Sequence, residues 1–355
     1  MNIQQAEAGS APQDFTFRGS ASEFFGIWIT NLLLSIVTLG IYSAWAKVRV
    51  KKYFYQNTYV AGRNFDYHAT GGQIFIGRLI VVAGLVAYSF LSLVPVMGPL
   101  LPLALIAVIP WLIVRALRFN ARMSSWSNVR FGFDGSAGQA FLVHYLLPVA
   151  TALTFFLMWP FATRAKQRFS ANGHRLGSSR FSFESGIGPF YRAFAIAGLC
   201  MLCLMLAFSL AVRISDLDIG AILDAHITDE LIALYTVLIY AAIFAVFVPV
   251  GLIYSALVRN VVFNNTTLGI GHRFQSSLHA GHYIWIILSN MLVSLVTLGL
   301  MLPWAHVRMA RYMASVTTLL PKGSLDGFQG EIEAGGSAIG DAYADIEGID
   351  LGIAV

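Results

Sequence analysis

The sequence predicts an all-α integral membrane protein with short surface β-hairpins, in which three repeated apolar units alternate with two transmembrane helical hairpins. Three observations lead to this class. Apolar residues make up 57% of the 355 residues and charged residues only 12%. Several apolar runs reach the roughly 18 to 20 residues that cross a ~30 Å hydrocarbon core. One of these runs also occurs twice, nearly unchanged, towards opposite ends of the chain.

The repeated run defines the three units. Two copies begin with Asn and end with Tyr, and they span Asn31 to Tyr53 and Asn290 to Tyr312. Their Thr-Leu-Gly, Trp-Ala and Val-Arg motifs recur at a constant offset of 259 residues. A degenerate middle copy lies at about 140–162, where Leu147 stands at the Asn position. Such internal similarity is typical of repeat proteins and of transporters.

The domains expected along the chain follow from these units. They are an N-terminal cytoplasmic segment with a short strand (1–22), a polytopic membrane domain (23–320) and an acidic, Gly-rich tail (321–355). Within the membrane domain we expect the repeat units at about 17–72, 130–188 and 273–320, and the helical hairpins at about 78–117 and 190–258. Alternating residues around a turn, as in 57–67, predict β-hairpins that lie at the membrane surface.

The distribution of charge predicts the topology. The 213–230 loop and the tail after Leu320 together hold 12 of the 18 acidic residues, so the rest of the chain carries a net charge of +15. If every apolar segment crossed the bilayer, some basic clusters would face outward, against the positive-inside rule. If only the two long hairpins cross, every basic cluster is cytoplasmic and the three units are re-entrant, with a bend near Thr-Leu-Gly. We favour the re-entrant interpretation, but a run of about 22 residues also fits an ordinary span.

Polar residues inside the apolar units are candidate intramembrane sites. They are Asn31, Thr38, Thr154, Asn290 and Thr297. An unsatisfied amide is costly in hydrocarbon, so the two Asn residues either line a pathway or form interhelical hydrogen bonds, and we favour the bonds. The Thr hydroxyls are expected to bond to carbonyls of their own helices.

The basic ends of the units are candidate interface and lipid contacts. They comprise Trp45, Lys47, Arg49, Lys51, Lys52, Arg164, Lys166, Arg168, Trp304, Arg308 and Arg311. Aromatic and basic residues at the end of an apolar run favour the bilayer interface, and clustered cations favour anionic headgroups. Anionic membrane lipid is therefore the expected partner, and nucleic acid is not.

Enzyme activity is not expected, because no nucleophile elbow, phosphate-binding loop or carboxylate pair is present. His279 and His282 have a spacing that could hold a metal on a helix, but no third ligand is near them in the sequence, so we expect no metal site or cofactor. Two functional hypotheses remain. A transport or channel-like protein should contain a polar cavity that joins the units. A non-transporting module that binds anionic lipid or a protein through its basic cytoplasmic face should have a sealed core.

Specific motifs also support a family resemblance. Phe17-Arg-Gly19, Thr38-Leu-Gly-Ile-Tyr42, Trp45-Ala-Lys-Val-Arg49 and the C-terminal Asp345-Ile-Glu-Gly-Ile-Asp-Leu-Gly352 resemble the YjgN family of bacterial inner-membrane proteins. The likeness covers essentially the whole chain. It implies a multi-pass protein of the bacterial inner membrane, in a family without an assigned molecular function, so no site residue is carried over from it.

Overall fold

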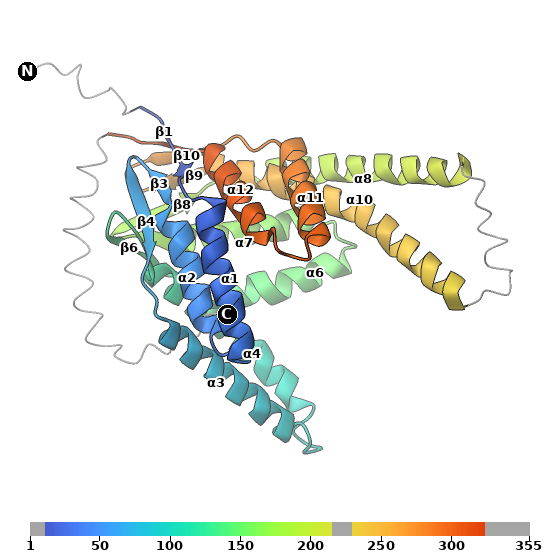
Figure 1. Ribbon diagram of the computed structural model, residues 1–355, viewed down its shortest axis with the longest axis horizontal. Coiled ribbons are helices and arrows are strands. Elements are labelled where there is room, and N and C mark those ends of the chain that lie inside the picture. Colours follow the sequence, from blue (N-terminus) through green and yellow to red (C-terminus); the bar gives the residue numbers. More distant parts are fainter. Residues whose placement is uncertain (1–10, 215–228, 324–355) are drawn as a thin grey trace, which may run out of the picture.

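The computed structural model describes residues 11–214 and 229–323, and it combines many helices with one large sheet (Figure 1). Most of the acidic 213–230 loop and almost all of the tail lie outside the described residues. The sequence also leads to the hypothesis that an acidic amphipathic segment of this tail docks on the basic clusters, and that segment lies outside the described residues. The helices are α1 (Ala21–Val37), α2 (Ser43–Gln56), α3 (Gly71–Leu91), α4 (Leu100–Arg122), α5 (Ala137–Phe141), the π-helical turn η2 (Leu142–Leu146), α6 (Leu147–Leu153), α7 (Trp159–Gly173), α8 (Gly188–Ile214), α10 (Asp229–Asn264), α11 (Ala280–Val296) and α12 (Leu302–Ser315). The strands are β1 (Gln13–Asp14), β2 (Thr16–Phe17), β3 (Thr58–Val60), β4 (Arg63–Tyr67), β5 (Ser124–Trp126), β6 (Val129–Phe133), β7 (His174–Leu176), β8 (Ser179–Phe183), β9 (Thr266–Leu268), β10 (His272–Ser276) and β11 (Thr317–Leu320).

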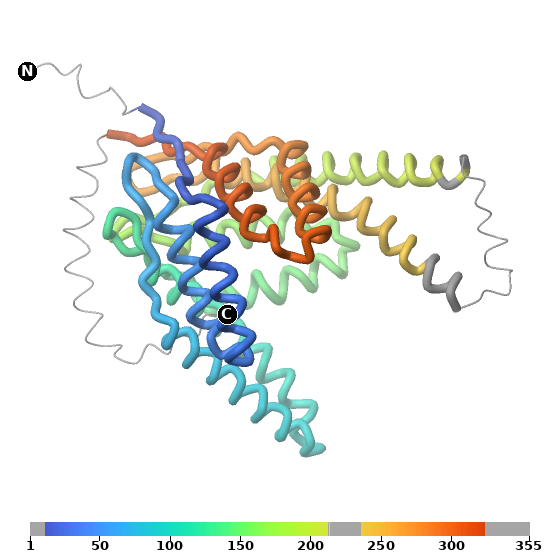
Figure 2. The backbone as a smooth tube through the Cα atoms, viewed as in Figure 1, coloured from blue at the N-terminus to red at the C-terminus, as the bar shows by residue number. Residues whose placement is uncertain are grey.

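The strands form a single antiparallel sheet, so the all-α expectation is wrong. Its order is β1-β11-β10-β9-β8-β7-β6-β5-β4-β3-β2, and β1 and β2 follow one another in the chain, which makes the sheet a nearly closed barrel. The amide of Phe15, between these strands, also donates to the carbonyl of Thr317 (3.0 Å). Figure 2 shows the blue N-terminal segment beside the red end of the chain, where β1 pairs with β11. The hairpins predicted at the membrane surface are thus parts of one sheet.

The interior of the sheet is filled by two sets of apolar side chains. Residues from successive hairpins form one buried set: Val60, Trp126, Val129, Leu176, Leu268 and Leu319. Five phenylalanines pack against it in the ring order Phe15, Phe65, Phe131, Phe181 and Phe274. Neighbouring rings in this order stack with centroids 6.0 to 6.4 Å apart, a favourable aromatic distance. The sheet is therefore a packed core.

All helical hairpins leave the sheet from the same rim. Each pair of helices begins after an even-numbered strand and ends directly before an odd-numbered one, and neighbouring strands are antiparallel. The tight turns that join strands within a hairpin, such as the one at Ala61 and Gly62, therefore lie at the opposite rim. These two residues have φ values of 52° and 74°, as favoured hairpin turns require. One rim thus faces the helices, and the other carries the β-turns together with the start of β1 and the end of β11.

Among the residues that the structure describes, four helices are long and apolar enough to cross a membrane. Their candidate spans are Gly71–Leu91, Leu100–Arg122, Gly188–Ala211 and Thr236–Asn264. They follow one another along the chain as α3 and α4 and as α8 and α10, and these helices extend furthest from the sheet (Figure 1). The repeat units contain only shorter apolar helices, Ala21–Val37, Ala137–Leu153 and Ala280–Val296. The four spans coincide with the segments that the re-entrant topology assigns as crossing, and the number of crossings itself stays a prediction.

Candidate functional site

The apolar run of each repeat unit is a bent hairpin and not one straight helix. Arg49 donates to the Oδ1 of Asn31 over 3.5 Å, although 18 residues separate them. In a continuous helix, 18 residues would span about 27 Å. Arg308 and Asn290, also 18 residues apart, make the same contact at 2.9 Å. The chain therefore turns back at each of these breaks, which supports the re-entrant interpretation over an ordinary span.

The tip of each hairpin is apolar and exposed. Leu39, Phe155 and Leu298 are 94%, 89% and 93% exposed, and they occupy the same position in the three breaks. Their φ values are nearly identical, at 50°, 49° and 50°. An exposed apolar tip is unfavourable in water but suits hydrocarbon, since transfer of apolar surface out of water is favourable.

The backbone at these tips satisfies its own hydrogen bonds. In the first break, Gly40 donates to the carbonyl of Ser35 (2.7 Å) and Ile41 to that of Thr38 (3.1 Å). The Thr38 hydroxyl donates to the Leu34 carbonyl (2.7 Å) and accepts from the amide of Tyr42 (3.0 Å). Thr154 and Thr297 make the equivalent pairs of bonds. Backbone without internal partners is excluded from lipid, so this bonding makes the tips compatible with the bilayer.

The two predicted Asn residues lie in the hairpin interiors but differ in their contacts. Asn290 is fully used, because its Nδ2 donates to the Ala305 carbonyl (3.1 Å) and its Oδ1 accepts from Arg308. Arg308 also donates to the Ser289 hydroxyl (2.7 Å) and lies over the Trp304 ring. Asn31 has only the 3.5 Å contact with Arg49, and in the described part of the chain its Nδ2 has no partner. The first copy of the pair is thus weaker than the third.

The middle hairpin has lost both members of this pair. Leu147 stands at the Asn position and is buried, while Ala165 stands at the Arg position and packs against the same cluster. The left-handed position that Gly40 and Gly299 occupy in the other breaks is Phe156, with φ 67°. Both members of the polar pair are therefore absent from this hairpin together, as expected of two residues whose role is local to each hairpin.

The predicted lipid contacts lie on α2, α7 and α12, the helices that return to the sheet. The exposed ones are Trp45, Arg49, Lys52, Lys166, Arg168, Trp304 and Arg311, and the half-buried ones are Lys47, Lys51, Arg164 and Arg308. Some are used in packing: Lys51 donates to the Oδ1 of Asn120 (2.6 Å), and Arg311 donates to the carbonyl of Gly19 (3.2 Å). Burial, followed by the charge of Arg78, lowers the pKa of Lys47.

Two of these arginines meet in one hollow. Arg164 and Arg168 line a cavity of about 390 Å³ together with Phe183 at the end of β8 and with Glu184, Ser185 and Gly186 of the loop between β8 and α8. The Nε of Arg164 donates to the Ser185 carbonyl (2.8 Å), which fixes one wall. The hollow lies at the helical rim, where hairpins that enter a bilayer would pass the headgroups. With two cations and one carboxylate, it has the charge and size for an anionic headgroup.

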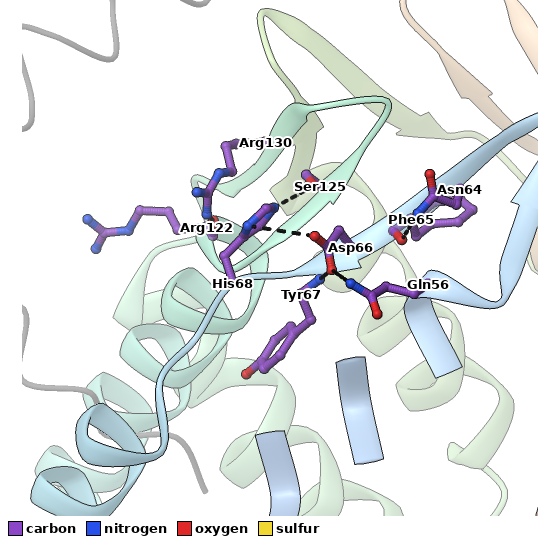
Figure 3. Close-up of polar contacts among 9 residues, drawn as sticks. All are labelled: Gln56, Asn64, Phe65, Asp66, Tyr67, His68, Arg122, Ser125 and Arg130. Atoms are coloured by element: carbon purple, nitrogen blue, oxygen red, sulfur yellow. Dashed lines mark hydrogen bonds and ion pairs between the residues drawn. The ribbon is translucent and has the colours of Figure 1, made fainter. Parts of the chain in front are cut away.

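A second polar cluster lies on the sheet beside the first hairpin (Figure 3). Asp66 accepts from Gln56 (3.1 Å) and lies 4.0 Å from the Nδ1 of His68. The Nε2 of His68 is 2.8 Å from the hydroxyl of Ser125, so the cluster joins α2 to two strands. Burial and then the charge of Arg130 lower the pKa of His68, while Asp66 opposes them. The lowered pKa favours the neutral imidazole.

The histidines of the third unit lie apart from any larger ligand group. Within residues 11–214 and 229–323, no three His, Cys, Asp or Glu side chains gather as a metal site would require. The Nδ1 of His279 is 3.0 Å from the Ser277 carbonyl, and the ring of His282 lies 4.8 Å from that of Tyr312. Both rings thus have local contacts.

Comparison with known proteins agrees with the family resemblance. The model of a family described as a bacterial protein of unknown function (DUF898) matches residues 12–346. Inner membrane protein YjgN of Salmonella typhimurium is 28% identical over 88% of this chain and 89% of its own length. The proteins of that name from Escherichia coli O157:H7 and K12 are 36% identical over 39% of this chain and 35% of theirs. No solved structure matches. The resemblance to the YjgN family is confirmed.

Proposed function

We propose that this membrane protein, which belongs to the DUF898 family of bacterial proteins of unknown function, is a non-transporting module that binds anionic lipid. In this proposal α3–α4 and α8–α10 cross the inner membrane, and the three repeat hairpins dip into its cytoplasmic leaflet. The sheet then lies in the cytoplasm, with its helical rim at the headgroups.

The hollow that contains Arg164 and Arg168 carries this proposal. Headgroup phosphates are anionic, and arginine forms two parallel hydrogen bonds with a phosphate. The hollow is at the rim from which all helices leave, which is the depth that a headgroup would occupy. The apolar tips of the hairpins support the same placement, because they belong with the acyl chains.

The packed sheet favours lipid binding over transport. A path along the axis of the five hairpins would have to pass through the sheet, where the buried Val60 to Leu319 set and the five phenylalanines lie. Opening such a path would expose many apolar side chains at a cost of roughly 1.5 to 3 kcal/mol each. The intramembrane Asn and Thr residues are used inside their own hairpins, which is also the arrangement expected of a structural role.

Retention of anionic lipid tests the proposal. The full-length protein in nanodiscs that contain a minor fraction of phosphatidylglycerol would be analysed by native mass spectrometry for lipids that remain bound. We expect Arg168→Glu to reduce retained phosphatidylglycerol several-fold, because it places a second carboxylate in the hollow. The effect should shrink at high salt, which screens exposed charges.

Arg273→Glu is the matched control. Arg273 is exposed on β10, so this variant has the same net charge as Arg168→Glu but leaves the hollow intact. We expect it to retain as much phosphatidylglycerol as the unmodified protein. Equal retention by all three proteins would refute the headgroup site.

A further inference from the structure

A second cavity lies between the helices and the sheet, away from the Arg164 hollow. Its volume is about 550 Å³, within the range of small-molecule sites. It is lined by the last turns of α2, α4, α10 and α12, by first residues of the odd strands, and by three of the five ring phenylalanines. Elements from four of the five hairpins therefore converge on it, near the axis of the molecule.

The chemistry of this lining is strongly asymmetric. Most of it is apolar, and the aromatic part includes Phe15, Phe54, Phe65, Phe131 and Phe263. One fully charged side chain, Arg259, faces the same space, and no carboxylate belongs to the lining. Its guanidinium donates to the hydroxyls of Thr317 (2.8 Å) and Ser276 and lies 4.3 Å from the centre of the Phe263 ring. In the described part of the chain, Arg259 thus has neutral partners only.

Arg259 is in an unusual position for such a cation. It lies in the last turns of α10, at the sheet end of the candidate span Thr236–Asn264, and its partners Ser276 and Thr317 belong to β10 and β11. A charge that is partly buried without a counter-charge is costly. Hydroxyl partners and an aromatic face hold its position but do not neutralise it. The positions equivalent to Arg259, counted back from the following strand, are Lys51 in α2, Leu117 in α4, Gln167 in α7 and Ala310 in α12, so three of the other four hairpins have no charge there. The charge is therefore not a requirement of the hairpin design.

From this arrangement we infer that the axial cavity binds a single-chain anionic amphiphile, with its carboxylate or monophosphate on Arg259 and its alkyl chain against the phenylalanines. An anionic head supplies the missing counter-charge through charge-assisted hydrogen bonds. The apolar wall supplies the area that an alkyl chain needs. A free inorganic anion would leave this wall unused, and a neutral amphiphile would leave Arg259 unneutralised.

Photo-crosslinking in the full-length protein tests the inference. The probe is a long-chain fatty acid that carries a diazirine on its chain, added to protein in an uncharged detergent, and labelled peptides are mapped by mass spectrometry. We expect labelling of peptides that contain Phe54, Phe65 or Met313. Palmitate and hexadecyl phosphate should compete for it, whereas hexadecanol should compete at least tenfold more weakly and inorganic phosphate not at all.

Further variants separate the effect of the Arg259 charge from that of the cavity space. Arg259→Gln should reduce labelling at least tenfold, and Arg259→Lys should retain part of it. Because Arg259 also holds Ser276 and Thr317, Ala310→Phe provides a test that keeps the charge and fills the space, and it too should abolish labelling. Arg273→Gln should label normally. Unchanged labelling of folded Arg259→Gln, or labels confined to the outer faces of α3, α4 and α8, would overturn the inference. Arg168→Glu should leave labelling intact, so the two lipid sites can fail independently.

Discussion

The first and third repeat hairpins hold a polar pair where the middle hairpin holds an apolar one. Arg49 contacts Asn31 and Arg308 contacts Asn290, whereas Leu147 and Ala165 occupy the matching positions of the middle hairpin. All three nevertheless have the same bend, and Leu39, Phe155 and Leu298 at its tip have nearly the same φ, 49° to 50°. The bend therefore does not depend on the polar pair. What the pair adds is a specific hydrogen bond between the two helices of the hairpin. Removing only one partner leaves the other as an unpaired polar group, which costs stability.

The largest effect is expected when one member of the third pair is removed. Arg308→Ala leaves the Oδ1 of Asn290 and the hydroxyl of Ser289 without their donor. A lost bond to a charged group costs about 1.5 to 3 kcal/mol, so the free energy of unfolding should fall by about 2 kcal/mol. Unfolding of the purified protein in mixed micelles by added SDS measures this change. Arg49→Ala should cost clearly less, because its contact with Asn31 is 3.5 Å long.

The double change Asn290→Leu with Arg308→Ala makes the third hairpin resemble the middle one. When both partners are replaced by apolar groups, the penalty for an unpaired polar group disappears. The double variant should therefore be more stable than Arg308→Ala alone. If instead the two losses simply added, the pair would not be the unit that the comparison implies.

The reverse change, Leu147→Asn in the middle hairpin, should cause the next largest loss in the free energy of unfolding. It buries an amide among apolar side chains without a partner, at a cost of about 1 to 3 kcal/mol. A second change, Ala165→Arg, should restore part of the loss, since it rebuilds the pair that the outer hairpins contain. The same SDS titration reports both values. Leu147→Ala, which removes volume without adding polarity, separates the cost of the amide from that of a cavity.

The tip of the middle hairpin offers a smaller, stabilising change. Phe156 has φ 67°, where the outer hairpins have Gly40 and Gly299 at 88° and 87°. A left-handed backbone costs a residue with Cβ roughly 1 to 2 kcal/mol. Phe156→Gly should therefore raise the free energy of unfolding by about 1 kcal/mol, and Gly299→Ala should lower it by a similar amount. No change in either variant would mean that lipid contacts of the tip outweigh backbone strain.

The sequence predicted the hairpins better than the sheet for a physical reason. The length of the apolar runs, the Thr-Leu-Gly break, the basic ends and the four long apolar segments are all local patterns that can be read directly from the sequence. The sheet depends on pairing between strands of two to five residues that are far apart, such as β1 with β11. A signal for its core was nevertheless present, because Arg130, Arg180 and Arg273 each precede a ring phenylalanine. Arg259 was overlooked because it is a single charge in a long apolar helix, and its convergence with three other helices is not visible in the sequence.

The smallest effect concerns pH, and it separates the sheet from the hairpins that stand on it. His272 lies fully buried in β10, and its Nδ1 accepts a hydrogen bond from the Lys322 amide (3.0 Å), which requires the neutral ring. Burial lowers its pKa. Between that lowered pKa and the unfolded value of about 6.5, the unfolded chain binds more protons, so the stabilising contribution is complete above pH 6.5 and is lost as the pH falls. The thermal unfolding temperature in detergent should therefore drop between about pH 7 and 5, and His68 should contribute in the same direction.

His272→Asn keeps a hydrogen-bond acceptor but does not titrate, so this variant should show a smaller drop in unfolding temperature, whereas the exposed His279→Asn should show the full drop. The Arg308→Ala and Leu147→Asn variants should unfold at a lower temperature than the parent protein by the same amount at every pH, because their changes lie in the hairpins. The opposite result would be a pH dependence of the unfolding temperature that changes in the hairpin variants and is unchanged in His272→Asn. It would place the acid-sensitive group outside the sheet.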